Sequence, residues 1–461
     1  MISAASRSIS RRIMMKIAGI VCEYNPFHEG HWLQISKLRY EHGVDAVICA
    51  MSGHFMQRGE PSVISKERRV KMALAGGADL VVELSALYAT RSAYWFALGG
   101  VLLLAAAGAT HIAFGAETDD LPAFQATAAR LAKPDRLYTE ALRRFLAAGL
   151  PFPEAQAKAL NYGQSSGNSF APALPNDRLA LSYLQVIAEK GLSLEPILIP
   201  RSGSAYHETK LPENQTPGAI LSPGATLAAG GLISPGGPAS LSGLPPASAT
   251  ALRRRLQEGI RLYDYRKLSA AQLTTLGVAK HIPEASLPYL ANTCLVFPAD
   301  VAPIQMALLR RADHQALLAL PDMTEGLENR IVDVACRAGS LEEFYRLLKT
   351  KRYPLTRLQR LVTHLLLDYR EIHARHLAGS PPYLRVLGAN STGFRLLHQA
   401  RKASPLPVIS RTRQMKELIR QNPHAAAAWE LEARSAALYS LISGSESAGG
   451  NPEYLFTPIS L

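Results

Sequence analysis

The heptapeptide NPFHEGH, residues 25–31, contains two histidines three residues apart around a glycine, in a chain that has 13 histidines among 461 residues. It directly follows the apolar run KIAGIVCEY. Two imidazoles near the start of a helix, together with the unpaired N–H groups of its first turn, form a pocket for a phosphate group that gains charge in a transition state. Purely structural histidines are one alternative and a zinc site is another, but no third zinc ligand lies at helical spacing from His28 and His31.

The elements around this motif predict a Rossmann-like α/β domain. Helical patterns cover residues 30–43, 65–78 and 178–191, and they alternate with apolar runs that we interpret as strands at 16–24, 46–53, 79–85, 110–117 and 194–201. Near-continuous apolar strands separated by helices indicate a parallel sheet covered on both faces. Ligands of such sheets bind beyond the carboxyl ends of the strands, which is where NPFHEGH lies.

The composition and the hydrophobic pattern of the chain change along its length, and these changes predict four regions. Residues 1–15 form a disordered extension, and residues 16–210 form the nucleotide-binding domain. Residues 211–248 form a flexible insertion that buries little apolar surface, because more than half of the residues from 217 to 248 are Pro, Gly or Ser. Residues 249–461 carry amphipathic helical patterns with few strand signals and form a mostly helical domain.

Composition limits the class of protein. The formal net charge of +13 favours a polyanionic partner, with nucleic acid ahead of a membrane. The four cysteines contain no C-x-x-C pair, so they predict reduced thiols in a cytoplasmic protein rather than a zinc ribbon or a disulfide framework. The apolar stretch from residue 95 to residue 115 has the length of a membrane span, but its internal glycines favour a buried helix followed by a buried strand.

Three further segments carry polar groups suited to phosphates or RNA. In PASATALRRRL, Ser248 or Thr250 caps a helix whose first turn presents N–H groups and Arg253 to a triphosphate. The loop QRGEPS, residues 57–62, follows the second predicted strand. The run RLLKTKRYPLTRLQR has six basic residues in fifteen and no acidic ones, which predicts an RNA-binding surface with an aromatic ring for base stacking. Its predicted RNA-contacting residues are Lys349, Lys351, Arg352, Tyr353, Arg357 and Arg360.

A set of motifs in fixed order resembles one family. NPFHEGH after a strand looks like the nucleotidyltransferase superfamily, which shares H-x-G-H with class I aminoacyl-tRNA synthetases. The strings GIVCEYNPFHEGH, MSGHFMQRGEPSVISKERRVKMALAGGADLVVEL, IAFGAE, LPNDRLALSYLQ, YHE, ASATALR, KTKRYPLTRLQRLVTHLLL and YLRVLG together resemble the tRNA(Met) cytidine acetate ligase family. The match runs over most of residues 16–393.

The resemblance implies an ATP-dependent ligase that activates acetate as acetyl-adenylate. The acetyl group then goes to the exocyclic amine of the wobble cytidine in elongator tRNA(Met), with Mg²⁺ accompanying the ATP. By this resemblance His28 and His31 are catalytic. The implied ATP-binding residues are Val21, Cys22, Glu23, Tyr24, Asn25, Pro26, Phe27, His28, Glu29, Gly30, His31, Trp32, Leu33, Gln34, Gly115, Asn176, Arg201, Thr250 and Arg253.

Two other functions compete with this hypothesis. An adenylyltransferase acting on a small phosphorylated metabolite would use the same histidine motif, but a long basic helical half would then have no purpose. An RNA-binding protein with an inactive nucleotide fold would not require His28, Gly30, His31 and Arg253, all of which are present.

Overall fold

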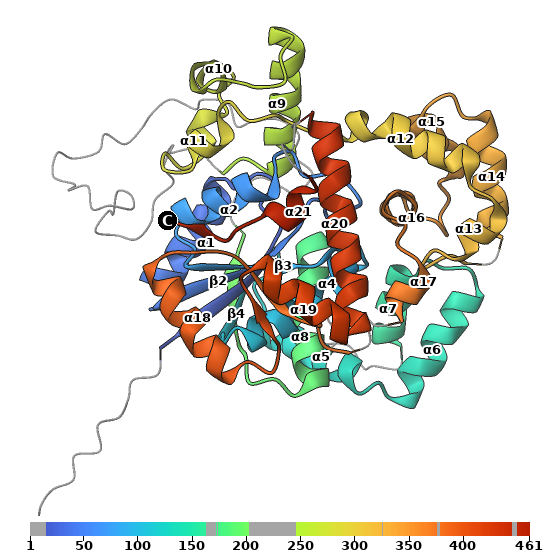
Figure 1. The fold of residues 1–461 in the computed structure, drawn as a ribbon. Coiled ribbons are helices and arrows are strands. Elements are labelled where there is room, and N and C mark those ends of the chain that lie inside the picture. Colours follow the sequence, from blue (N-terminus) through green and yellow to red (C-terminus); the bar gives the residue numbers. More distant parts are fainter. Residues whose placement is uncertain are drawn as a thin grey trace, which may run out of the picture.

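The computed structural model describes residues 15–162, 172, 174–201, 246–324, 326–375, 379–444 and 450–461. Nearly all of the predicted N-terminal extension and of the Pro/Gly/Ser-rich insertion therefore lies outside the described residues, as does the YHE motif at 206–208. The remaining chain forms a sheet covered by helices, with a group of helices set to one side (Figure 1).

The N-terminal half builds the predicted parallel sheet. Its five strands lie in the order β5-β4-β1-β2-β3 and are parallel throughout. The strands β1 to β4 are buried over most of their length, which is why each reads as a continuous apolar run, whereas β5 at the sheet edge is only partly buried. The strands are β1 (Ile17–Cys22), β2 (Ala46–Ser52), β3 (Leu80–Leu84), β4 (His111–Ala116) and β5 (Glu195–Pro200).

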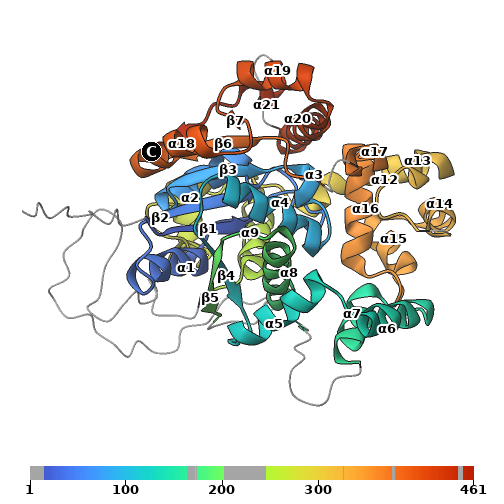
Figure 2. The ribbon, with the colours of Figure 1, turned by 90° about the horizontal axis from the view of Figure 1, so that it is seen from below.

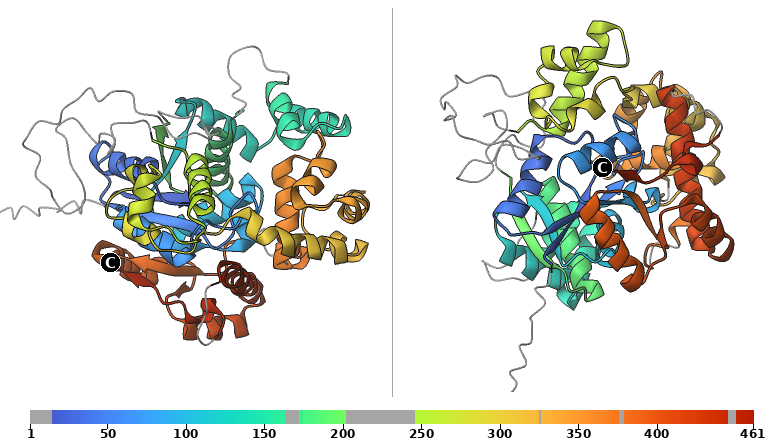
Figure 3. Two further views of the ribbon diagram at one scale, coloured as in Figure 1. Left: turned by 90° about the horizontal axis from the view of Figure 1, so that it is seen from above. Right: turned by 60° about the vertical axis from the view of Figure 1, so that its left-hand side comes forward.

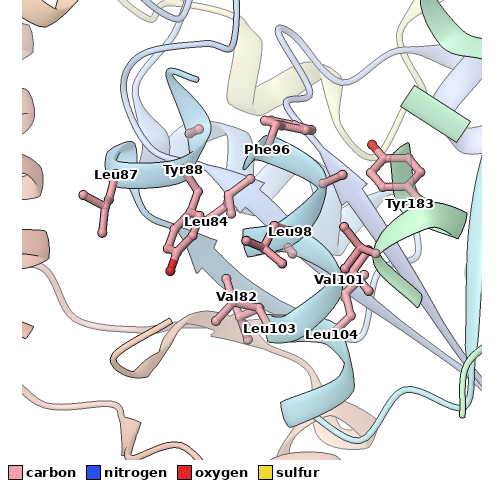
Figure 4. Close-up of a cluster of buried hydrophobic side chains, with 14 of the residues drawn as sticks. Val82, Leu84, Leu87, Tyr88, Phe96, Leu98, Val101, Leu103, Leu104 and Tyr183 are labelled. Carbon is pink, nitrogen blue, oxygen red and sulfur yellow. The ribbon is translucent and has the colours of Figure 1, made fainter. Parts of the chain in front are cut away.

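Helices pack on both faces of this sheet. On one face α4 and β3 share a hydrophobic cluster, which includes Phe96, Leu98 and Val101 of α4 and Val82 and Leu84 of β3 (Figure 4). The apolar stretch 95–115 is thus α4 followed by β4, and no helix in the described ranges is long and apolar enough to cross a membrane. The helices of this half are α1 (Glu29–Tyr40), α2 (Lys66–Ala75), α3 (Ala86–Ala89), α4 (Ala93–Ala106), α5 (Leu121–Ala132), α6 (Arg136–Ala147), α7 (Phe152–Asn161) and α8 (Pro175–Lys190).

Residues beyond 249 are mostly helical and fall into three groups (Figures 2 and 3). The first group packs near α1 and α2 and comprises α9 (Ala249–Tyr263), α10 (Ala270–Thr275), η1 (Ala279–His281) and α11 (Leu287–Leu290). The second group has a core of its own and comprises α12 (Pro298–Arg311), α13 (His314–Leu318), α14 (Leu327–Arg337), α15 (Leu341–Leu348), α16 (Leu355–Leu367) and α17 (Glu371–Ala374). The third comprises α18 (Ser391–Ala403), α19 (Thr412–Gln421), α20 (Pro423–Ser443) and α21 (Pro452–Leu455).

The third group also contains strands, which corrects the interpretation of 249–461 as one helical domain. Strand β6 (Leu384–Ala389) pairs antiparallel with β3 and extends the nucleotide-binding sheet. Two short strands, β7 (Val408–Ile409) and β8 (Ile459–Ser460), pair with β6. The sequence pattern misses β6 because YLRVLG is a short run. All six residues of the strand are buried in the structure.

Buried charges join this third group to the sheet. Lys66 Nζ lies 2.6 Å from Glu83 Oε1 at the end of β3 and 2.7 Å from Glu453 Oε1 on α21. Arg385 Nη1 on β6 lies 2.8 Å from Glu83 Oε2 and also pairs with Glu453. Because removing one partner would leave a buried charge unpaired, this network fixes the C-terminal segment to the first half of the chain.

Candidate active site

The H-x-G-H motif forms the start of α1. His28 is the residue before the first helical turn, and its Nδ1 accepts a hydrogen bond from the Gly30 N–H at 3.0 Å. His31 Nδ1 accepts from the His28 N–H at 3.3 Å, and the two ring centroids lie 3.8 Å apart. Because each Nδ1 is an acceptor, each neutral ring carries its proton on Nε2. The motif therefore presents two Nε2–H donors beside the N–H groups of the helix.

The electrostatic surroundings keep both rings neutral. Burial, reinforced by His31 and by Arg201, lowers the pKa of His28 well below its usual value. Burial and the Arg201 charge lower the pKa of His31 to about 3. The two side chains are therefore uncharged at neutral pH and offer hydrogen-bond donors rather than cations. A protonated pair at this centroid distance would also repel itself.

Gly115 and Arg201 meet at the carboxyl ends of β4 and β5. The Arg201 N–H donates to the Ala116 carbonyl oxygen at 2.9 Å. A Cβ added at Gly115 would lie 3.3 Å from Cγ of Arg201, so glycine leaves room for the arginine side chain to lie across β4. Arg201 also lies close enough to both histidines for its charge to lower their pKa.

Asn176 lies in the first turn of α8, next to the loop that follows β4. Its side-chain amide donates to Glu117 Oε1, and the Asp177 N–H donates to Glu117 Oε2 at 3.0 Å. Asp177 in turn accepts from the N–H groups of Glu117 and Thr118 at 2.8 and 3.0 Å. The Asn-Asp pair therefore fixes the loop at the edge of the site, and Glu117 serves this local network.

The N-terminus of α9 supplies the opposite wall. Ser248 caps this helix by accepting from the Ala251 N–H at 3.1 Å. Arg253 Nη1 donates to the Asn25 carbonyl oxygen at 2.9 Å, and Nη2 lies 3.3 Å from Thr250 Oγ1. The PASATALRRRL segment thus contacts the motif directly, although more than 200 residues separate the two in the chain.

Several other residues of the segment 21–34 pack into the protein interior beneath the motif. The side chains of Tyr24, Phe27 and Trp32 are buried in the core under the sheet edge. Asn25 Oδ1 accepts from the Val63 N–H at 2.7 Å. Glu29 is fully buried, with its carboxylate 3.8 Å from His281 Nδ1. Because these side chains face the protein interior, only their backbone groups are available to a ligand.

Sequence reasoning missed Arg69, which lies on α2 and is fully buried. Its guanidinium donates to the carbonyl oxygens of Glu23 at 2.7 Å, of Ser52 at 3.0 Å, and of Gly53. It therefore joins the carboxyl ends of β1 and β2 directly below the site. Burial lowers its pKa to about 10, so it stays charged at neutral pH. In KERRVK nothing distinguishes Arg69 from Arg68, which is only partly buried.

The basic run of the second helical group is only partly exposed. Lys349, Lys351 and Arg352 are exposed in the turn between α15 and α16. Arg357 Nη2 donates to the Asp322 carbonyl oxygen at 2.8 Å, and burial lowers the pKa of Arg360 to about 10. We call residues 349–352 the basic turn.

The prediction that Tyr353 stacks on a base is wrong for this structure. Tyr353 is 5% exposed and belongs to the core of the second helical group. Three guanidinium groups surround its ring at 5.5 to 5.9 Å, those of Arg330, Arg352 and Arg357. The sequence suggested an exposed aromatic because basic residues flank it, but the ring packs inward and the arginines cover it.

The carboxylates near the motif are all engaged. Glu23 Oε1 accepts from the Gln57 N–H at 2.6 Å, and Glu29 and Glu117 have the partners described above. Within the described ranges, one group of three acidic side chains has the spacing of a metal site, namely Glu83, Glu432 and Glu453. Lys66 and Arg385 already pair with Glu83 and Glu453 of this group, so it does not fit a divalent cation.

The buried neutral histidines predict a pH-dependent stability. Burial is the main cause of the lowered pKa of His28, His31, His54 and His364. The unfolded chain binds protons at these rings below about pH 6.5 while the folded protein does not, so the free energy of unfolding falls as the pH drops through that value. We expect a loss of about 1 kcal/mol per ring between pH 7.5 and 5.5.

Urea unfolding at the two pH values measures this loss. His364→Gln should show a smaller difference than the wild-type protein, and His42→Gln, at the far end of α1, should match the wild type. Equal unfolding midpoints at both pH values would contradict the prediction.

Known proteins resemble this chain over most of its length. The model of the HIGH Nucleotidyl Transferase family matches residues 15–220 and 239–451. A tRNA(Met) cytidine acetate ligase of Syntrophomonas wolfei is 34% identical over 440 residues, covering 93% of this chain and 95% of the relative. The relative of the same name from Bacillus subtilis is 32% identical over 399 residues, covering 86% and 87%.

Solved structures agree with the sequence relatives. The crystal structure of Thermotoga maritima TmcAL in its apo form has a TM-score of 0.82 at 26% identity, covering 97% of this chain and all of the other. The same protein bound with alpha-thio ATP has a TM-score of 0.80 with the same identity and coverage.

A parallel sheet with an H-x-G-H helix start at its carboxyl edge defines a nucleotidyltransferase, and the family match agrees. Within that class, the identity and coverage of the relatives decide the assignment. The chain belongs to the tRNA(Met) cytidine acetate ligase family.

Proposed function

We propose that this protein is an ATP-dependent ligase that acetylates the exocyclic amine of the wobble cytidine of elongator tRNA(Met). The observation that carries the proposal is the convergence of side chains from three elements at the H-x-G-H motif. His28 and His31 lie at the start of α1, Arg201 at the end of β5, and Arg253 at the start of α9. A relative's structure holds alpha-thio ATP, which supports ATP as the ligand of this fold.

The first half-reaction joins two anions. Acetate has a pKa near that of an aspartic acid side chain, about 4, so it attacks as the carboxylate without a general base. One acetate oxygen forms a bond to the α-phosphorus of ATP while the bond to the bridging oxygen of pyrophosphate breaks. The two Nε2–H donors and Arg201 face the phosphates and lower the repulsion between the reactants, and Arg253 holds the motif backbone in place.

We propose that Mg²⁺ enters as the MgATP complex rather than in a protein cage. The three carboxylates at the motif are engaged with Gln57, His281 and Asp177, and so are not arranged as an octahedral ligand set. When bound, the ion would neutralise charge on the phosphates. The protein contributes the histidine donors, the helix N-termini and the arginines.

The second half-reaction transfers the acetyl group to a neutral amine. The amine nitrogen attacks the acetyl carbon, the carbon–oxygen bond to AMP breaks, and the amine loses a proton. AMP is a good leaving group, so positioning of the cytidine supplies most of the catalysis. We propose that the basic turn, Lys349–Arg352, binds the RNA backbone, with support from Arg357 and Arg360 at its side.

Incubation with labelled acetate and ATP, with and without tRNA, tests the proposal. We expect pyrophosphate release with acetate and label in tRNA, located by nuclease digestion at the wobble position of elongator tRNA(Met). Pyrophosphate release only with a phosphorylated small molecule would support the adenylyltransferase alternative. Tight tRNA binding without turnover would support an inactive RNA-binding protein.

A further inference from the structure

A buried hydrogen bond joins α16 to the loop that follows β2. The hydroxyl of Thr363, which is fully buried, donates to the Gly59 carbonyl oxygen at 2.6 Å. Gly59 has φ +81°, and an added Cβ would lie 2.7 Å from the Gln359 carbonyl oxygen. Helix and loop therefore approach so closely that only glycine fits at this position.

The same loop is held at its other side by the nucleotide-binding segment. We call residues 54–62 the bridging loop. Its Gln57 N–H donates to Glu23 Oε1 at 2.6 Å, and Glu23 directly follows β1. Backbone bonds within the loop join Met56 to Glu60 at 2.8 Å and Ser62 to His54 at 2.8 Å. The bridging loop is thus a closed unit that contacts the nucleotide-binding segment at Gln57 and α16 at Gly59.

Helix α16 has further fixed contacts at the same edge of the sheet. His364 Nε2 lies 2.9 Å from the Thr90 carbonyl oxygen, and the Tyr369 hydroxyl donates to the Leu87 carbonyl oxygen at 2.7 Å. The basic turn precedes the opposite end of α16, whose first residue, Leu355, lies about two helical turns, roughly 12 Å, from Thr363. A rotation of α16 on the bridging loop would therefore move the basic turn relative to the nucleotide.

We propose that Thr363 is a positioning residue for acetyl transfer: its hydrogen bond to the bridging loop sets the orientation of α16, and so of RNA bound at the basic turn, relative to the adenylate. This inference rests on the proposed function. Adenylate formation uses α1, β5 and α9 and does not require this orientation. RNA binding uses the basic turn, which Thr363 does not contact. The contact is therefore needed only for the step in which both sites act together.

Thr363→Val tests the proposal because it keeps the shape of the side chain and removes the donor. We expect acetate-dependent ATP–pyrophosphate exchange within about twofold of wild type, and a KM for tRNA within about twofold. The kcat for acetyl transfer should fall at least tenfold. Thr363→Ser should restore transfer because it returns the hydroxyl. Thr356→Val, in the first turn of the same helix, is the matched control and should behave as wild type.

The outcomes separate this inference from the proposed function. If the wild-type protein transfers no acetyl group to tRNA, the proposed function fails. If the wild type transfers and Thr363→Val transfers equally well, the positioning role is wrong. An equal loss of exchange and of transfer, with a lowered unfolding midpoint, would also overturn the positioning role, because that result would mean that Thr363 only stabilises the fold.

Discussion

Alanine at position 31 should reduce acetate-dependent ATP–pyrophosphate exchange about 10²- to 10³-fold, the usual effect of removing one preorganised donor from a developing anion. His31 holds its Nε2–H donor in place through the bond from the His28 N–H to its own Nδ1, and it is neutral because burial lowers its pKa to about 3. Its removal therefore deletes a fixed donor without changing the net charge. Radiolabelled pyrophosphate incorporated into ATP measures the effect.

The binding of tRNA by this variant should stay close to wild type, because the basic turn lies on another element. His42→Ala is the matched control, since His42 follows the far end of α1. Undiminished exchange in His31→Ala would remove this histidine from the catalytic assignment.

Combined replacement of Lys351 and Arg352 by alanine should have the reverse effect. Both side chains are exposed in the basic turn. A contact between such a basic side chain and an RNA phosphate contributes to affinity mainly because it releases counterions from the RNA. We expect tRNA affinity to fall tenfold or more near physiological salt, with the slope of log K against log salt reduced by about 1.5. Filter binding over a range of salt concentrations measures both quantities.

Adenylate formation in the double variant should be unchanged. Lys416→Ala with Arg420→Ala, two exposed basic residues of α19, removes the same charge elsewhere and should preserve both the affinity and the slope. Equal loss of exchange and of tRNA binding would contradict the assignment of the two activities to separate elements.

The part of the site that follows from local pattern could be predicted from the sequence. NPFHEGH comes directly after an apolar strand, and its glycine and histidine spacing determine the start of α1. Gly115 and Arg201 were implied by the resemblance to a family, and they lie together because parallel neighbouring strands place their carboxyl ends side by side. Resemblance to a family added the distant Arg253, whose contact with Asn25 no local pattern predicts.

The remainder depended on tertiary contacts. Arg69 and Tyr353 have the sequence surroundings of exposed residues, yet the fold buries both. Side-chain burial is decided by which elements pack together, and helical periodicity specifies only one face of each helix. The bridging loop was expected to be functional from its place after β2, but its contact with Thr363 joins residues 304 positions apart.

The pairing of β6 with β3 has a consequence for the order of assembly during translation. About 300 residues separate the two strands, so at typical rates of synthesis the ribosome needs roughly 15 to 60 s to supply the partner of β3. Until then β3 has an unpaired edge, and nascent chains are open to association through it. A ribosome stalled before residue 384 would accordingly hold a chain that requires chaperone protection, however complete its ATP-binding motifs.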